Sequence, residues 1–470
     1  MLSAVRNGVA SPSTSEPTRD ARQRLVRRGW RAPKRVASSS EFSRPHTPFV
    51  LNGWGQRYCS IGPPSGTVRR RCSLWFALTY RCIRGRVNND AHGRADEASQ
   101  LTQTCEAVQW LVNSGVYPGV QVYVSRNCEP VLDTVVGRRT QHELLGVDDP
   151  LPLLSASKGV LAAAIALLWE RGAIDLDAPV CSYVPEYGAN GKERVTVRHL
   201  LTHSVGPVGE PHRDESHAAL ARKPLGEALG AVLRDACAAS LSDGDGPGTR
   251  SAYSPTWSWV LLAEIARRSD GRFFTDLVSE EVLRPIGARL VYGRPVESQG
   301  VPGVIYDTSD PKLRSLRIHR VVTEGAGLAS PGIGLWGSAR EIGKFFEFLL
   351  RRGLAPDGRR VLSEATVAAM TTPQRPTLFD NQPMIDIGLG LTIEGRRHGT
   401  RYAYFGLECS TETFGHYGLR SALIFCDPRE GLVAALVGNG YPQSLRKHLA
   451  WRRFCRALYH DHSRVAGRRG

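Results

Sequence analysis

The chain has 470 residues, 41% of them hydrophobic and 23% charged, which is a globular composition and excludes a collagen-like or wholly disordered protein. Its formal net charge is +16, but residues 1–100 contain 18 Lys and Arg against 6 Asp and Glu, so the rest of the chain is nearly balanced. No nucleic-acid-binding motif follows this basic segment, and no run reaches the ~18 apolar residues of a membrane-spanning helix, so we expect neither a nucleic-acid partner nor stable membrane insertion.

Residues 1–98 contain Pro, Ser, Gly and Arg without sustained periodicity, and the polar run at 88–99 is typical of a linker. We predict that this basic extension is disordered. Its first 45 residues could also be an organelle transit peptide or a stretch upstream of the true start codon, and the sequence leaves these alternatives open. The ten cysteines form no Cys-x-x-Cys pair, which favours free thiols and, without a credible export signal, a cytoplasmic location.

The folded part is expected to begin near Leu101. Helical spacing of apolar residues predicts a helix over 101–113, and two β-branched runs at 120–124 and 131–136 predict a hairpin. An Ala- and Leu-rich helix at 159–170 follows and stops at Arg171-Gly172. Further helices are predicted at 197–203, 225–239, 258–268, 273–283, 338–352 and 443–459. Short apolar runs predict late strands at 385–393, 401–406, 421–426 and 432–437.

Strands at both ends of this region, with helices between them, indicate an α/β fold of the α+β type in which a helical insertion separates the two parts of one sheet. We predict one domain at 99–460 and a basic tail at 461–470. Within the domain we expect a sheet lobe of about 99–157 and 330–460 and a helical lobe of about 158–329. The oligomeric state does not follow from the sequence.

Ser155 and Lys158 stand three residues apart at the start of the 159–170 helix, so their side chains share one side of that turn. A serine hydroxyl becomes a good nucleophile when a base removes its proton, and a buried lysine beside it can do so. Ser-x-x-Lys alone is a common pattern, and an N-cap serine beside a solvated lysine is the alternative. The apolar runs on both sides disfavour a solvated Lys158 and favour the catalytic interpretation.

Further segments follow in a recognisable order. The set comprises Ser155-Ala-Ser-Lys158, Gly172 to Pro179, Val197 to Ser204, Tyr253-Ser-Pro255, Gly325 to Leu328, Gly388 to Leu391 and Gly415-His-Tyr-Gly418. With these motifs, residues 101–460 resemble the serine β-lactamase and penicillin-binding-protein superfamily, most closely its class C β-lactamase-like esterases and transesterases. The resemblance implies a β-lactamase/transpeptidase-like fold, an antiparallel sheet flanked by helices with a mostly helical inserted lobe.

The resemblance also implies roles for matching residues. Ser155 would be the acylated nucleophile and Lys158 its proton acceptor. Tyr253 matches the tyrosine of the family's Tyr-x-Asn motif and would act with the lysine as general base. His416 stands in the place of Lys-Thr-Gly on the strand that lines the site. There it would orient or protonate the reacting groups. Each has a structural alternative, a satisfied core tyrosine for Tyr253 and a structural histidine for His416.

The remaining predicted site residues follow His416. Tyr417, Gly418 and Leu419 would contact the substrate, and the backbone N–H groups of Ser155 and Leu419 would form the oxyanion hole. Preorganised donors of this kind contribute several kcal/mol to acyl transfer.

Three segments depart from the family pattern. Pro255 replaces the asparagine of Tyr-x-Asn and has no side-chain amide, which makes efficient β-lactam turnover doubtful. Ser204-Val205-Gly206 stands where Thr-Ser-Gly is expected after His203. Leu419-Arg420 replaces small residues and would add bulk and positive charge to the acyl pocket.

A metal site is a further possibility raised by His199 and His203, which are four residues apart in a predicted helix. They lack a Glu between them and a third ligand, and the segment resembles a structural stretch of the family. We therefore assign no metal and no cofactor.

The sequence thus predicts a cofactor-free serine hydrolase that acts on a small-molecule ester or amide through an acyl-enzyme. Carboxylesterase or transesterase activity ranks first, D-amino-acyl peptidase second and β-lactamase third. A catalytically silent member that serves as a binding or scaffold protein is the alternative of a different class, motivated by Pro255 and Arg420. It predicts that Lys158 points to solvent or that Arg420 or Tyr417 fills the cleft.

Overall fold

The computed structural model describes residues 101–206, 210, 223–241, 246–295, 303–310, 317–319, 323, 329–374, 388–393 and 405–467. The predicted N-terminal extension and the motif at 325–328 lie outside the described residues.

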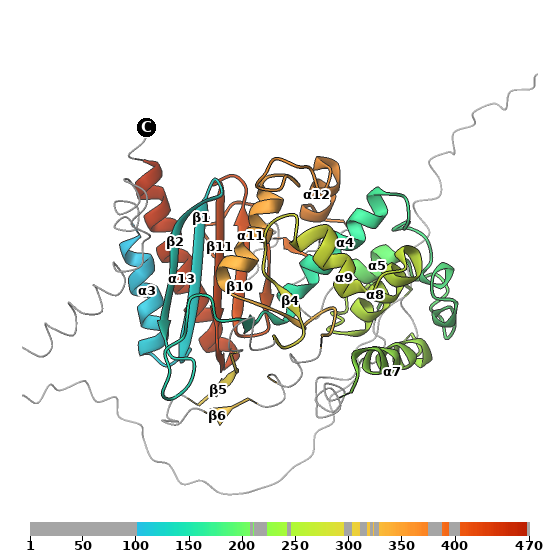
Figure 1. Ribbon diagram of the computed structural model, residues 1–470, viewed down its shortest axis with the longest axis horizontal. Coiled ribbons are helices and arrows are strands. Elements are labelled where there is room, and N and C mark those ends of the chain that lie inside the picture. Colours follow the sequence, from blue (N-terminus) through green and yellow to red (C-terminus); the bar gives the residue numbers. More distant parts are fainter. Residues whose placement is uncertain are drawn as a thin grey trace, which may run out of the picture. The chain divides into compact units, whose positions relative to one another are not determined.

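The centre of the fold is a six-stranded sheet in the order β2-β1-β11-β10-β9-β8, and every neighbouring pair is antiparallel (Figure 1). Its strands are β1 (Gly119–Arg126), β2 (Glu129–Gly137), β8 (Thr392–Ile393), β9 (Phe414–Gly418), β10 (Ala422–Asp427) and β11 (Leu432–Gly438). Val120 pairs with Gly438, so the first hairpin and the last strands form one sheet. The predicted antiparallel sheet built from both ends of the domain is confirmed.

The hairpin forms because β-branched residues alternate on both sides of a short turn. Asn127 and Cys128 occupy that turn with φ angles of +49° and +64°, a region that asparagine tolerates better than most residues. The register shifts between Val124 and Ser125, where a bulge accommodates the turn.

Helices cover both faces of the sheet, as Figure 1 shows. The helices α3 (Thr102–Asn113) and α13 (Ser444–Ala466) pack on one face and α11 (Ala339–Leu350) on the other. Strand alternation serves both layers: Val433 and Val437 of β11 join the core under α11, whereas Leu432 and Leu436 join the core under α13.

The helical lobe follows β3 (Leu151–Pro152) and the 3₁₀ turn η1 (Leu154–Ala156). Its central helix is α4 (Ser157–Glu170), whose apolar residues are buried all round, as its uninterrupted Ala and Leu content predicts. The other elements around it are η2 (Val180–Ser182), η3 (Pro185–Tyr187), α5 (Val197–Leu201), α7 (Leu225–Ala238), α8 (Trp257–Asp270), α9 (Phe274–Val278), the π-helical turn η4 (Ser279–Leu283) and α12 (Glu364–Thr371).

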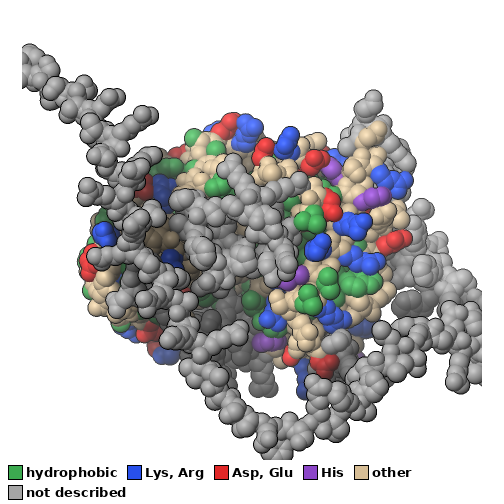
Figure 2. All heavy atoms as spheres, turned by 180° about the vertical axis from the view of Figure 1, so that it is seen from behind, with side chains coloured by type: hydrophobic (Ala, Val, Ile, Leu, Met, Phe, Trp, Pro, Cys, Tyr) green, Lys and Arg blue, Asp and Glu red, His purple; other side chains and the backbone are tan. Residues whose placement is uncertain are grey.

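Two small sheets border the main one. The first has the order β3-β7-β4, with β4 (Val291–Tyr292) and β7 (Leu335–Gly337), and the second β12-β5-β6, with β5 (Tyr306–Thr308), β6 (Arg317–Ile318) and β12 (Gly440–Pro442). Among the described residues no helix is long and apolar enough to cross a bilayer. Seen from behind, the described surface shows basic side chains scattered among hydrophobic and acidic ones (Figure 2).

Two strand predictions were wrong in the described residues. Of the described residues 388–393, only Thr392–Ile393 is a strand, because Gly390 has a φ of +65° and a Cβ added to it would be 2.5 Å from Ala162 Cβ. Of 401–406, Phe405 and Gly406 are not in a strand, and Gly406 has a φ of +95°. Tight turns against a neighbouring helix replace extended backbone at both places.

Candidate active site

Ser155 lies in η1, at the entrance to α4, and is 5% exposed. The preceding Leu154 has a φ of +52°, a strained conformation for a leucine. Ser157 stabilises this turn, because its hydroxyl donates to the Leu154 carbonyl and accepts a 3.0 Å hydrogen bond from Leu335 N on β7. The short connection from β3 into α4 thereby fixes the direction of the Ser155 side chain.

Lys158 is fully buried in the first turn of α4. Its Nζ lies 3.4 Å from Ser155 Oγ and donates to the carbonyl oxygens of Pro255 at 3.1 Å and Gly332 at 2.8 Å. It also lies 5.2 Å from the centre of the Tyr253 ring. The carbonyl oxygens and the aromatic face hold the buried Lys158 amine in place.

Tyr253 reaches the same hydroxyl from the segment that precedes α8. Its phenol donates a 2.8 Å hydrogen bond to Ser155 Oγ. The ring packs on His203 at 4.5 Å between centres, and His203 Nδ1 accepts a 3.1 Å hydrogen bond from Ser254 N. His203 therefore holds the Tyr253 segment in place, and its contacts agree with the structural interpretation of that histidine.

The start of α8 is capped from a distant part of the chain, because its N-cap residue Thr256 makes no side-chain cap of its own. Glu210 accepts hydrogen bonds from Thr256 N at 2.7 Å, Trp257 N at 3.0 Å and the Ser254 hydroxyl at 2.6 Å. Burial raises the pKa of the Glu210 carboxyl, opposed by these hydrogen bonds and by the charge of Lys158. A carboxylate at a helix N-terminus satisfies donors that the helix leaves free.

Pro255 lies between these anchored residues. The family asparagine that it replaces would offer an amide side chain, whereas here the backbone carbonyl of Pro255 accepts from Lys158. The residues on either side of Pro255 are anchored, because Ser254 and Thr256 both donate to Glu210. Lys158 thus keeps a polar partner at this position despite the substitution.

His416 lies on β9 and is 4% exposed. Its Nδ1 is 2.9 Å from the Tyr417 carbonyl, and since a carbonyl only accepts, Nδ1 carries the proton and Nε2 has the free lone pair. Burial, followed by the charge of Lys158, lowers the pKa of His416 to about 3. The ring is therefore neutral near pH 7.

Gly418 ends β9 where the strand crosses the segment before Ser155. A Cβ on Gly418 would lie 2.2 Å from the Leu153 carbonyl oxygen, so only glycine allows this approach. The next residue, Leu419, has a φ of +46° and packs with Leu154 and Trp336. Both predicted substrate-contact residues therefore lie beside the turn that carries the serine.

Tyr417 and Arg420 lie elsewhere. Tyr417 faces the opposite side of β9 from His416, as strand alternation requires, with its ring 5.5 Å from Lys447 Nζ and 6.1 Å from the Trp451 ring. Arg420 lies over the Tyr441 ring at 4.5 Å and donates to the Pro442 carbonyl. The predicted contact between Tyr417 and substrate has no geometric support, and Arg420 is engaged at the edge of the small β12-β5-β6 sheet.

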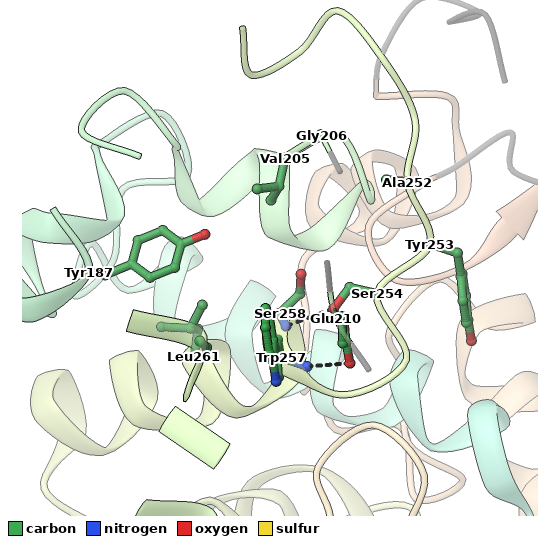
Figure 3. A pocket seen from close by; sticks show the side chains of 11 residues that line it. Tyr187, Val205, Gly206, Glu210, Ala252, Tyr253, Ser254, Trp257, Ser258 and Leu261 are labelled. Carbon is green, nitrogen blue, oxygen red and sulfur yellow. Dashed lines mark hydrogen bonds between the residues drawn. The ribbon is translucent and has the colours of Figure 1, made fainter. Parts of the chain in front are cut away.

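A cavity of about 190 Å³ adjoins the Tyr253 segment (Figure 3). Its walls are mostly apolar, with Glu210 among the polar groups, and none of Ser155, Lys158 and His416 lines it. The Tyr253 ring points away from the cavity side chains Tyr187 and Leu261. Tyr253 is itself among the residues that line the cavity, so the cavity borders the segment that contacts Ser155.

Three contributors to the site were missed from the sequence. Gly332 supplies a carbonyl, Glu210 caps α8, and His203 supports Tyr253. A backbone carbonyl leaves no sequence signal, and Glu210 is 44 or more residues from the groups that it contacts. The His-Leu-Leu-Thr-His stretch was the one signal available, and it identified His203 only as structural.

Comparison with known proteins agrees with this architecture. The family model described as Beta-lactamase matches residues 100–457. The chain is 26% identical over 321 residues to the esterase/beta-lactamase LipL of Mycobacterium tuberculosis, covering 62% of this chain and 70% of that protein. It is 29% identical over 254 residues to esterase EstB of Burkholderia gladioli, covering 46% of this chain and 60% of that protein.

Solved structures share the fold. A penicillin-binding protein homologue from Caulobacter crescentus superposes with a TM-score of 0.64 at 23% identity, covering 77% of this chain and 97% of that one. A family VIII carboxylesterase superposes with a TM-score of 0.62, also at 23% identity and with the same coverage. Because the family match spans most of the sequence and the fold agrees, the chain belongs to the β-lactamase family of serine hydrolases.

Proposed function

We propose that this protein is a carboxylesterase or transesterase in which Ser155 forms the acyl-enzyme. The observation that carries the proposal is the convergence of Lys158 Nζ, at 3.4 Å, and Tyr253 OH, at 2.8 Å, on Ser155 Oγ. A nucleophile between two proton carriers is the arrangement that acyl transfer requires.

In the first step Ser155 transfers its proton to the Lys158–Tyr253 pair, in which Lys158 is a neutral amine, while Oγ attacks the ester carbonyl carbon. The oxyanion of the tetrahedral intermediate accepts hydrogen bonds from the N–H groups of Ser155 and Leu419. Collapse of the intermediate breaks the bond to the alkoxide, which takes the proton from the pair and leaves as an alcohol. Water, or a second alcohol, then attacks the acyl-enzyme by the reverse sequence.

His416 has an orienting role in this proposal. A pKa of about 3 leaves the imidazole neutral near pH 7, so it cannot act as an imidazolium acid there. Its Nε2 can accept a hydrogen bond from a substrate or from Lys158, which would favour the orienting alternative over the protonating one.

Esterase activity ranks above β-lactamase activity because Pro255 offers no side-chain amide. The similarity to LipL, an esterase/beta-lactamase, and to EstB, an esterase, supports the same ranking. The silent alternative is disfavoured, since Lys158 is buried beside Tyr253 and Arg420 lies over Tyr441.

The test compares substrates on the purified full chain and on Ser155→Ala. We expect p-nitrophenyl butyrate to be hydrolysed with a kcat/KM about 100-fold above that for nitrocefin, and Ser155→Ala to lose about 10³-fold or more of the ester activity. Preferential nitrocefin turnover would reverse the ranking. Ester turnover that survives in Ser155→Ala would remove Ser155 from the proposal.

A further inference from the structure

The outer side of α13 combines exposed leucines with exposed arginines. Leu445 and Leu449, one turn apart near the start of the helix, are 71% and 56% exposed. Arg452 and Arg456 continue the same stripe at spacings of three and four residues, and Arg453 lies beside them. All three arginines are exposed. We call these five residues the outer face of α13.

These arginines differ from the basic residues of α13 that serve packing. Arg446 donates to the carbonyls of Ser114 and Thr308, and Lys447 is buried over the Trp451 ring. By contrast, the ion pairs of the described residues include none at Arg452, Arg453 or Arg456.

The neighbouring helix adds an aromatic side chain. The half-buried Trp110 of α3 lies against the Arg453 guanidinium, 4.7 Å from the ring centre. Glu106, one turn earlier on α3, is an exposed acidic residue on that helix. The outer face and Trp110 together therefore present leucine, tryptophan and arginine in one continuous strip.

We propose that the outer face of α13 docks this protein onto the surface of an anionic phospholipid bilayer. Leucine and tryptophan are the side chains that enter the boundary between headgroups and acyl chains, and arginine pairs with lipid phosphates. Residues 1–100, with 18 Lys and Arg against 6 Asp and Glu, are too basic to be a favourable partner for this basic face. A nucleic acid would engage the arginines but would leave the two leucines in water.

The leucine end of α13 also adjoins the turn that follows His416. Arg420, in that turn, donates a 3.1 Å hydrogen bond to the carbonyl of Pro442, two residues before α13 begins, and its own carbonyl accepts from Tyr117 OH. Docking through Leu445 and Leu449 would bring this end of the sheet toward lipid. If the proposed function holds, ester substrates would then be drawn from the bilayer surface, but the docking itself does not depend on activity.

The test measures co-sedimentation of the full chain with vesicles of phosphatidylcholine, with and without phosphatidylglycerol. We expect binding to the vesicles that contain phosphatidylglycerol. Both Leu445→Ser with Leu449→Ser and the triple variant Arg452→Glu, Arg453→Glu and Arg456→Glu should reduce the partition coefficient about tenfold or more. Circular dichroism checks that each variant is folded, and labelling of Ser155 is scored separately.

The matched controls make the same kinds of substitution on other surfaces of the protein. Leu144→Ser with Ile318→Ser removes two side chains that are 72% and 51% exposed, and Arg234→Glu, Arg284→Glu and Arg359→Glu changes the net charge equally. Both sets should bind like the wild type. Failure of the wild type to bind phosphatidylglycerol vesicles, or equal losses in the controls, would overturn the proposal. So would retention on heparin together with wild-type vesicle binding by the leucine variant, which would indicate a polyanion site.

Discussion

Lys158 is held by the carbonyl oxygens of Pro255 and Gly332, at 3.1 and 2.8 Å, so its ammonium is directed by backbone that side-chain substitution cannot remove. Lys158 therefore has a polar partner at residue 255 although proline offers no side-chain amide there. Ser155 and Lys158 were predictable from their spacing, and Tyr253 from the family resemblance. The supporting carbonyls were not, because every residue has one.

Replacing Tyr253 with Phe removes the phenol that contacts Ser155 Oγ and should lower kcat for ester hydrolysis by about 10²–10⁴-fold, the usual contribution of a proton-transfer group. Steady-state kinetics on the purified variant would measure it. Tyr306→Phe is the matched control, since its phenol donates to the Arg139 carbonyl and should leave kcat unchanged. Equal kcat values in Tyr253→Phe and the wild type would contradict a role for this phenol.

His416 should make stability depend on acid pH. Its pKa is about 3 in the folded protein and near 6.5 when unfolded, so between these values the unfolded state binds the extra proton and stability falls as the pH falls. In His416→Gln, the free energy of unfolding should change less with pH than in the wild type, by up to about 1.4 kcal/mol per pH unit. Urea unfolding at pH 7 and pH 4.5 would measure it, with exposed His142→Gln as control. An unchanged slope in His416→Gln would show that the ring is not buried as neutral imidazole.

At the scale of elements, α8 contributes to the candidate site only through its first turn and the segment that leads into it. Ser254, Thr256 and Trp257 all bond to Glu210, and Tyr253 and Pro255 lie between or beside them. Hydrophobic periodicity predicted α8 itself, since it buries one apolar side. It could not predict the cap, because that carboxylate comes from another part of the chain.

Glu210→Ala should leave the donors of this first turn without acceptors and so loosen the segment that carries Tyr253. We expect a loss of about 1–3 kcal/mol in the free energy of unfolding and about a tenfold slower reaction of Ser155 with a fluorophosphonate. Chemical denaturation and stopped-time labelling would measure the two effects. Glu210→Gln retains an acceptor oxygen and should recover part of both. If Glu210→Ala is destabilised but its Ser155 reacts with the fluorophosphonate at the wild-type rate, Glu210 contributes to stability and not to the reactivity of Ser155.

At the scale of the whole molecule, strand pairing between β1 and β11 joins the two ends of the domain. The sequence predicted both groups of strands and the helical insertion, because apolar periodicity is local. It did not predict the order of the six strands or the two small sheets, since their two- and three-residue strands have no periodicity to detect. The turns at Gly390 and Gly406 were not predicted, because their apolar neighbours suggest a strand and a positive φ leaves no signal in the sequence.

Deleting residues 1–98 should preserve cooperative folding. The family match begins at residue 100, and α3 is anchored to α13 through hydrogen bonds from Thr104 N and Oγ1 to Asp461. Thermal unfolding of the truncated chain should show one transition with a midpoint close to that of the full chain. Loss of soluble, cooperatively folding protein would show that the extension belongs to the folded unit.

The most direct measurement is intact-protein mass spectrometry after incubation with a fluorophosphonate, on the wild type and on Ser155→Ala. Such reagents modify activated serines, and the hydrogen bonds of Ser155 to Lys158 and Tyr253 predict one adduct per chain that is absent in Ser155→Ala. A folded wild-type chain that forms no adduct, or an adduct that persists in Ser155→Ala, would contradict the assignment of Ser155 as the nucleophile.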